Sequence, residues 1–277
     1  MMKMLQVADK VRFRTMTTQE LRDTFLLTDL FQPEEISLTY VDIERIVIGS
    51  AVPISTPLLL PTYDSLRAAY FTERRELGIL NIGGQGSVTV NDQTFTLQNL
   101  DGLYIGRGNE HIQLESTDPD KPAEFYLLSY PAHAAHPTRY VRSNEQEKTS
   151  LGATETANRR EIIKLIYPAA IQSCQLVMGF TQLATGSVWN TMPPHTHMRR
   201  SEIYLYFNLP LKERILHLMG PPQETRNLIV ANKEAVISPA WSIHAGAGTT
   251  SYSFCWGMGG ENQAYDDMDP VAIADLR

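Results

Sequence analysis

The 277-residue sequence has few cysteines, no long apolar run and no excess of positive charge. Its two cysteines, Cys174 and Cys255, lie far apart in short apolar runs, which indicates buried free thiols in a reducing compartment. No segment is long and apolar enough to span a bilayer, and residues 1–10 lack the apolar core of a signal peptide. The net charge of -7 gives no electrostatic reason to bind nucleic acid or an anionic membrane. We therefore expect a cytoplasmic protein without nucleic-acid or membrane partners.

Long helical periodicity is also nearly absent. The exception starts at Thr17, which forms a predicted capping box with Glu20 and opens a short helix that ends before Pro33. Elsewhere, short runs of β-branched and aromatic residues alternate with Gly, Pro, Asn and Asp, a pattern typical of a sandwich or barrel. The glycine-rich segment 83–86 lacks the lysine and the helix of a phosphate-binding loop, so we expect a β-turn.

The length suits two lobes or one large β domain. Residues 142–160 are polar and are predicted to connect two strand series of similar density. The sequence therefore predicts an N-terminal lobe over residues 1–155 and a C-terminal lobe over residues 156–277.

His195 and His197 are separated by one residue, so their side chains share a face if the backbone is extended. Imidazoles with a nearby carboxylate suit zinc and other divalent transition metals. Glu202 lies at an odd offset, so residues 198–201 are predicted to turn the chain into a hairpin with a metal at its mouth. His244 follows Pro239 in a glycine-rich passage between strands and supplies a third imidazole. A histidine pair alone is common at surfaces, but the added carboxylate and third histidine favour a metal.

The remaining histidines are weaker candidates. His111 has no second histidine two positions away, so the first lobe is predicted to lack a metal. His133 and His136 lie in a proline-bounded loop and are interpreted as loop or interface residues. His217 is interpreted as a hydrogen-bonded strand residue.

Strand alternation after residue 201 places Glu202, Tyr204 and Tyr206 on one face, with apolar residues on the other. The first face can form the wall of a polar cavity.

The spacing His-x-His-x4-Glu, followed by Pro-x4-His, resembles the two motifs of the cupin superfamily, whose small β-barrels hold one metal through three histidines and a glutamate. The chain departs from that pattern in two places. Gly186 stands farther before His195 than usual, and no Asn follows His244 at the expected position. The four ligand types are all present.

Further segments carry a closer resemblance: Glu73–Gly78, Asn81–Gly84, Trp189–Pro193, Met219–Arg226, Gly257–Gln263 and Asp266–Ala272. Together, from about Leu21 to Arg277, the chain closely resembles the 5-keto-4-deoxyuronate isomerase family (4-deoxy-L-threo-5-hexosulose-uronate ketol-isomerases) of bacterial pectin breakdown. The resemblance implies a mostly β bicupin of two antiparallel β-barrels or jelly rolls with a few short helices, assembled as a homo-hexamer.

The family also implies one zinc per chain in the second lobe, held by His195, His197, Glu202 and His244. Manganese, iron or nickel would suit the same ligands.

The implied reaction converts 5-dehydro-4-deoxy-D-glucuronate into 3-deoxy-D-glycero-2,5-hexodiulosonate, an aldose–ketose isomerisation of a small sugar acid. A metal acting as Lewis acid would stabilise the enediolate. Tyr204, Tyr206 and Glu224 are the candidate bases, and a hydride shift needing no base stays open. Each tyrosine could equally be a barrel-wall residue, and Glu224 a solvated turn carboxylate. Arg200 is the candidate for binding the substrate carboxylate, whereas Arg199 is interpreted as a solvated turn residue.

Two other kinds of function fit the same ligands. One is another metal-dependent cupin, either an Fe(II) dioxygenase or a 5-deoxy-glucuronate isomerase. The other is a non-catalytic sugar-binding bicupin. A sensor of that kind would need a DNA-binding module, and a storage protein usually carries a secretory signal, and neither is found in the sequence.

Overall fold

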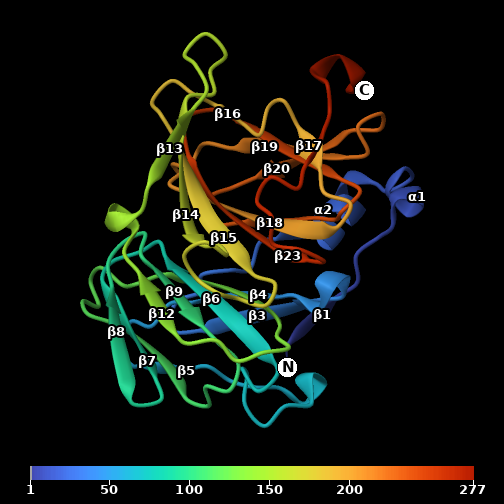
Figure 1. Ribbon diagram of the computed structural model, residues 1–277. Coiled ribbons are helices and arrows are strands. Elements are labelled where there is room, and N and C mark those ends of the chain that lie inside the picture. Colours follow the sequence, from blue (N-terminus) through green and yellow to red (C-terminus); the bar gives the residue numbers. More distant parts are fainter. Residues whose placement is uncertain (1) are drawn as a thin grey trace. The chain divides into compact units, whose positions relative to one another are not determined.

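The computed structural model describes residues 2–277, and the chain is mostly β-strand, as predicted (Figure 1). It forms two compact units, each built from segments that are not contiguous in the sequence. Unit 1 contains residues 2–5, 29–146 and 165–177, and unit 2 contains residues 6–28, 147–164 and 178–277. A stretch near the N-terminus thus belongs with the C-terminal half of the chain. The single boundary after residue 155 stays a prediction.

Unit 1 is built from a seven-stranded sheet, in the order β1-β3-β4-β11-β6-β9-β12, and a four-stranded sheet, in the order β5-β10-β7-β8. Neighbouring strands are antiparallel, except that β1 and β3 are parallel. The larger sheet contains β1 (Lys3–Leu5), β3 (Ile36–Val41), β4 (Val47–Ala51), β6 (Arg75–Asn81), β9 (Gly102–Ile105), β11 (Phe125–Pro131) and β12 (Arg139–Val141). The smaller sheet contains β5 (Leu58–Leu59), β7 (Gly86–Val90), β8 (Gln93–Leu97) and β10 (Ile112–Ser116).

Apolar side chains from both sheets of unit 1 form one core. Leu77 and Ile79 of β6 pack in the same buried cluster as Val88 of β7. The predicted turn at residues 83–86 joins these two strands. A Cβ atom at Gly84 would lie 2.0 Å from the carbonyl oxygen of Lys121, so this close approach of two backbone segments requires glycine.

Unit 2 repeats this pair of sheets and adds a small one. Its seven-stranded sheet has the order β13-β14-β15-β23-β18-β21-β2, its four-stranded sheet the order β16-β22-β19-β20, and β17 pairs with β24. The seven-stranded sheet contains β2 (Leu26–Leu27), β13 (Lys148–Leu151), β14 (Arg160–Ile166), β15 (Val177–Leu183), β18 (Arg200–Phe207), β21 (Ala235–Ser238) and β23 (Ser253–Gly260). The other strands are β16 (Trp189–Asn190), β17 (His195–Thr196), β19 (Ile215–Gly220), β20 (Arg226–Val230), β22 (Ile243–Gly248) and β24 (Asp269–Pro270).

In the described part of the chain the helices are few and short, and the two α-helices are α1 (Lys10–Phe13) and α2 (Thr18–Phe25). The predicted capping box is confirmed, because the Thr17 hydroxyl accepts from the Glu20 amide at 3.3 Å and the Glu20 carboxylate accepts from the Thr17 amide at 2.7 Å. Phe25 contacts Trp241 with ring centroids 6.2 Å apart, which fixes α2 on unit 2. No helix in residues 2–277 is long and apolar enough to cross a membrane.

Two sequence-based expectations need correction. The segment 142–160 is not only a connection, because β13 lies within it and pairs with β14 in the sheet of unit 2. The expected strand over residues 173–180 begins only at Val177. In unit 1 the backbone amides of Cys174 and Gln175 donate to the buried carboxylate of Glu76 at 2.6 and 2.7 Å, so these amides are not available for strand pairing.

Candidate metal centre

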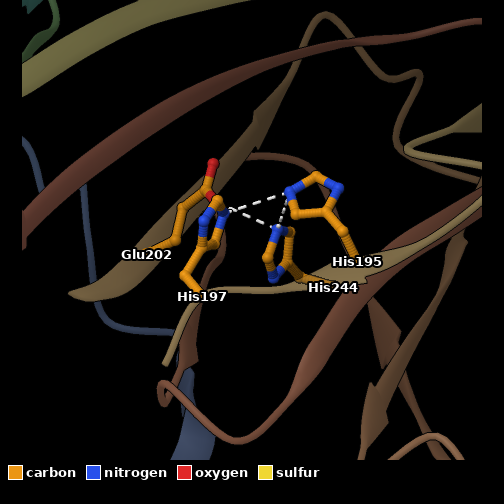
Figure 2. A group of neighbouring side chains, drawn as sticks. All are labelled: His195, His197, Glu202 and His244. Carbon is orange, nitrogen blue, oxygen red and sulfur yellow. Dashed lines mark hydrogen bonds and ion pairs between the residues drawn. The ribbon is translucent and has the colours of Figure 1, made fainter. Parts of the chain in front are cut away.

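Three segments of unit 2 bring the four predicted ligand side chains together (Figure 2). His195 lies in β17, and His197 follows that strand directly. Glu202 is the third residue of β18, and His244 is the second residue of β22. Figure 2 shows the four side chains pointing toward one another, and their ligand atoms all lie within 4.8 Å of one another.

The chain turns at Met198 and Arg199, as predicted, where the Arg200 amide donates to the His197 oxygen at 3.3 Å, but β17 and β18 lie in different sheets and do not form the predicted hairpin. β17 pairs with β24 near the C-terminus, with His195 opposite Pro270. β18 already begins at Arg200 and pairs with β21 and β23. The carboxylate therefore comes from the middle of a large sheet, and the histidine pair comes from a short strand held by the C-terminal segment.

The donor atoms of the four side chains are closely spaced. Nε2 of His197 lies 3.0 Å from Nε2 of His195 and 3.0 Å from Oε2 of Glu202. Nε2 of His244 lies 3.1 Å from Nε2 of His195 and 3.0 Å from Oε2 of Glu202. A neutral imidazole has one acceptor nitrogen and a carboxylate accepts only, so these atoms repel one another unless a proton or a cation lies among them.

Contacts on the far side of each ring orient two of these imidazoles. Nδ1 of His197 lies 2.8 Å from the backbone oxygen of Asp267, which can only accept, so Nδ1 carries the hydrogen and the lone pair of Nε2 faces Glu202. The Arg200 guanidinium approaches the same Nδ1 at 3.4 Å, but it cannot donate to a nitrogen that carries a hydrogen. Nδ1 of His244 lies 3.2 Å from the Ser238 hydroxyl. Metal-binding histidines are typically oriented in this way, and the donor set fits a divalent transition-metal ion.

The electrostatics of the cluster keep its groups in ligand form. Burial, together with the neighbouring His244, lowers the pKa of His195 to about 3. Burial alone would raise the pKa of Glu202, but its interactions with His244 and His197, each with Nε2 3.0 Å from Oε2, outweigh burial and hold that pKa well below its usual range. At neutral pH the cluster therefore offers a neutral His195 and an ionised carboxylate, the forms that bind metals.

Two arginines fix the C-terminal segment beside His197. Arg200 is fully buried and donates to the backbone oxygens of Ala264, Tyr265 and Asp267, the last two at 3.3 and 3.1 Å. Arg199, expected to be a solvated turn residue, is instead ion-paired, with its Nε 2.7 Å from Oδ1 of Asp267. The Asp267 oxygen is also the partner of His197, so Arg200 holds the backbone that orients a candidate ligand.

A cavity of about 340 Å³ opens beside the four residues, which is within the range of about 300–1,000 Å³ for small-molecule sites. Alternate residues of β23 line it, namely Phe254, Trp256 and Met258, because strand side chains alternate between faces. His195, His197 and Glu202 line the same cavity.

Of the predicted catalytic residues, only Tyr204 lines this cavity. Its hydroxyl lies 2.9 Å from that of Thr191, and burial together with the charge of Glu202 raises its pKa well above the ordinary value. Tyr206 is fully buried and lies 2.7 Å from Nδ1 of His217, which confirms His217 as a hydrogen-bonded strand residue. Glu224 is exposed in the turn between β19 and β20 and does not line the cavity. Neither does Arg200, whose guanidinium faces backbone oxygens.

Sequence reasoning missed several cavity residues, above all Arg160, Thr181 and Tyr265. Arg160 had been placed at the end of the interlobe connection, whereas it is the first residue of β14. Arg160 and Ile162 both line the cavity, so the alternation along β14 was the available signal.

Unit 1 has a different residue at the position that matches Glu202. β6 and β18 are each fifth in their seven-stranded sheets. Leu77 is the third residue of β6 and pairs with Ile105 at the end of β9, just as Glu202 pairs with Ser238 at the end of β21. Leu77 belongs to the apolar core and offers no ligand atom.

Comparison with known proteins gives a family and close relatives. The model of the KduI/IolB family matches residues 37–273. The 4-deoxy-L-threo-5-hexosulose-uronate ketol-isomerase of Lachnoclostridium phytofermentans is 51% identical over 261 residues, which cover 94% of this chain and 95% of that protein.

Solved structures show the fold. An IolB-like protein from Salmonella typhimurium is similar with a TM-score of 0.71 at 16% identity, over 87% of this chain and 95% of that one. A variant of Bacillus subtilis oxalate decarboxylase is similar with a TM-score of 0.57 at 11% identity, over 79% of this chain and 70% of that one. The predicted bicupin class is thereby confirmed.

Proposed function

The chain belongs to the KduI/IolB family, and from this premise we propose that it is a 4-deoxy-L-threo-5-hexosulose-uronate ketol-isomerase. The observation that supports this most strongly is the near-full-length identity of 51% to a protein of that name. The buried cluster of three histidines and one glutamate beside a cavity of suitable size is consistent with it.

The reaction moves hydrogen between neighbouring carbons without any external oxidant. The substrate has an aldehyde at C1 and a hydroxyl at C2, and the product has a hydroxyl at C1 and a ketone at C2. The hydrogen on C2 is transferred to C1, and the hydroxyl proton passes from O2 to O1. A site for this reaction must stabilise negative charge on these two oxygens and hold the carbon chain in place.

In this proposal His195, His197, Glu202 and His244 hold a divalent metal ion. Such an ion, when bound, polarises carbonyl and hydroxyl oxygens as a Lewis acid. Glu202 supplies the single negative charge of the set, so the neutral imidazoles leave the site with net positive charge. Burial of the three most enclosed members, His197, Glu202 and His244, excludes bulk water from one side of the site.

Tyr204 is the residue that we assign to hydrogen-bond donation to a substrate oxygen. Its raised pKa keeps the phenol protonated at neutral pH, so it can donate a hydrogen bond to a substrate oxygen as that oxygen gains negative charge. The same raised pKa makes the phenolate a rare species, so Tyr204 is a poor base for the C2 hydrogen. Tyr206 and Glu224 are left without a catalytic role, since neither lines the cavity.

We extend the proposal to zinc as the resident ion, one per chain, and to a homo-hexamer that acts in pectin breakdown in the cytoplasm. These points rest on the resemblance of the sequence motifs to the isomerase family. Elemental analysis of protein purified without added metal tests the ion, and light scattering tests the assembly.

The activity is tested by incubating the purified, zinc-loaded protein with the product of unsaturated-galacturonate breakdown and following the 2,5-diketo acid by NMR. We expect the aldehyde signal to be replaced by that of a hydroxymethyl group. No turnover would refute the proposal. Parallel incubations with 5-deoxy-glucuronate, and measurements of oxygen consumption, test the two other metal-dependent cupin functions.

A further inference from the structure

We infer that Arg160 binds the carboxylate of the substrate, so that the cavity of unit 2 contains an anion subsite in addition to the candidate metal centre. The identity of the ligand as a uronate rests on the proposed function. The anion subsite itself can be tested without turnover.

Among residues 2–277, Arg160 is the only arginine or lysine that lines the cavity. It is half-buried at the start of β14, and Ile162 from the same strand face lines the cavity beside it. A uronate that enters this cavity therefore meets a single permanent cation of the protein.

The guanidinium of Arg160 has more N–H donors than its hydrogen bond within the protein uses. Its Nη1 donates to the backbone oxygen of Asn158 at 2.9 Å, and within residues 2–277 Arg160 forms no ion pair with a carboxylate. An arginine has five N–H donors and stays protonated in proteins, so several donors remain for a ligand. A half-buried charge without a counter-ion is costly, and an anionic ligand offsets that cost.

The other two arginines near the site, Arg199 and Arg200, already form hydrogen bonds and ion pairs within the protein. Arg199 directs Nε to Asp267 and Nη2 to Asp269, with distances between 2.7 and 3.2 Å. Arg200 directs both Nη atoms to backbone oxygens, including that of Asp267 at 3.1 Å. Arg160 is the one arginine of the three that lines the cavity.

Arg160 and the metal centre share a neighbour. Tyr204 lines the same cavity as Arg160 and has its ring centroid 5.3 Å from that of His244. A substrate with a carboxylate at one end and an aldehyde with its neighbouring hydroxyl at the other can thus be held at two points of one cavity. Bidentate contact with a guanidinium fixes the plane of a carboxylate, which orients the rest of the chain.

Calorimetric titration of the full-length, metal-loaded protein with D-galacturonate and D-galactose tests this inference. These two sugars differ only in the carboxylate at C6. We expect the wild type to bind D-galacturonate about 10- to 100-fold more tightly than D-galactose, the range of a charge-assisted contact. Arg160→Gln should reduce the preference to less than about threefold, and Arg160→Lys should retain part of it because the charge remains. Arg139→Gln removes the same charge from an exposed strand of unit 1 and should leave the preference unchanged.

Kinetics with the uronate substrate give a second readout. Arg160→Gln should raise KM about 10- to 100-fold and lower kcat much less. Equal binding of D-galacturonate by the wild type and Arg160→Gln would overturn the inference, and so would a wild type without preference for the acid. Should Arg160→Gln fail to fold, Arg160→Lys carries the test through a measurable fall in preference. A wild type that prefers the acid but does not turn over the uronate would support the subsite and refute the proposed function.

Discussion

Replacing Arg200 with methionine should weaken the metal centre without removing substrate recognition. The change keeps the length of the side chain and removes its charge and hydrogen bonds. The carbonyl oxygens of Ala264, Tyr265 and Asp267 then lose their donor. A buried acceptor left unsatisfied costs about 1–3 kcal/mol. Because this segment is partly exposed, water can hydrogen-bond to some of these carbonyl oxygens, which reduces that cost. Methionine also avoids the cost of burying a charged guanidinium, which offsets a further part of the lost stability. We expect the free energy of unfolding to fall by about 2–4 kcal/mol.

The same variant should bind zinc about 10- to 100-fold more weakly, because the Asp267 oxygen that fixes the His197 ring is no longer held. Urea denaturation of metal-free protein measures the first effect, and titration against a chelator of known affinity measures the second. Arg139→Met, at an exposed position, is the matched control. If Arg200→Met were as stable as the wild type and bound zinc equally well, but showed a raised KM, then Arg200 would contact substrate as its sequence position predicted.

Three further predictions concern single residues. Gly179→Ala places a Cβ atom 2.4 Å from the Trp256 ring, so it should destabilise the protein by about 1–3 kcal/mol in urea denaturation; an unchanged midpoint would contradict this packing. Burial lowers the pKa of His217 from 6.5 to about 3, so the unfolded chain takes up this proton first as the pH falls. The contribution of neutral His217 to the free energy of unfolding is therefore complete above about pH 6.5 and is lost as the pH falls toward 3. Between pH 7 and pH 5 the free energy of unfolding of the wild type should fall by about 2 kcal/mol more than that of His217→Gln. Parallel curves of unfolding free energy against pH for the two proteins would refute the lowered pKa. Tyr204→Phe should lower kcat about 100-fold at unchanged zinc content, while Tyr206→Phe should leave kcat near that of the wild type; similar kcat values for the two variants would count against a hydrogen bond from Tyr204 to the substrate oxygen.

Local sequence signals predicted the parts of the fold that depend on neighbouring residues. The capping box at Thr17 was predictable because short-range hydrogen bonds determine it. The glycines of residues 83–86 correctly marked the connection between β6 and β7, although the close approach of the Lys121 backbone that requires Gly84 is a long-range contact. The four candidate ligands were recognisable as well, because His195, His197 and Glu202 lie close together in the chain. Their residue types and their spacing indicate that they can bind one metal ion.

Long-range pairing was not predictable from local patterns. The C-terminal strand β24 pairs with β17, and this contact replaced the expected hairpin. The carboxylate of Glu76, nearly a hundred residues earlier in the chain, accepts hydrogen bonds from the amides of Cys174 and Gln175, so β15 begins only after these residues. Arg200 was predicted to bind the substrate carboxylate because nothing local shows that its guanidinium donates to the backbone of residues 264–267. These hydrogen-bonding and strand-pairing partners are determined by the tertiary fold, and the sequence around each residue does not indicate them.

We propose that isomerisation depends on a metal ion held by His195, His197, Glu202 and His244. The most direct measurement is turnover of the uronate by chelator-treated protein, by the same protein after one equivalent of zinc, and by Glu202→Gln at equal zinc concentration. We expect no activity without metal, recovery that saturates at one ion per chain, and a large loss of activity in Glu202→Gln together with weaker zinc binding. Full activity of metal-free protein, or a zinc-independent rate in Glu202→Gln equal to that of the wild type, would contradict it.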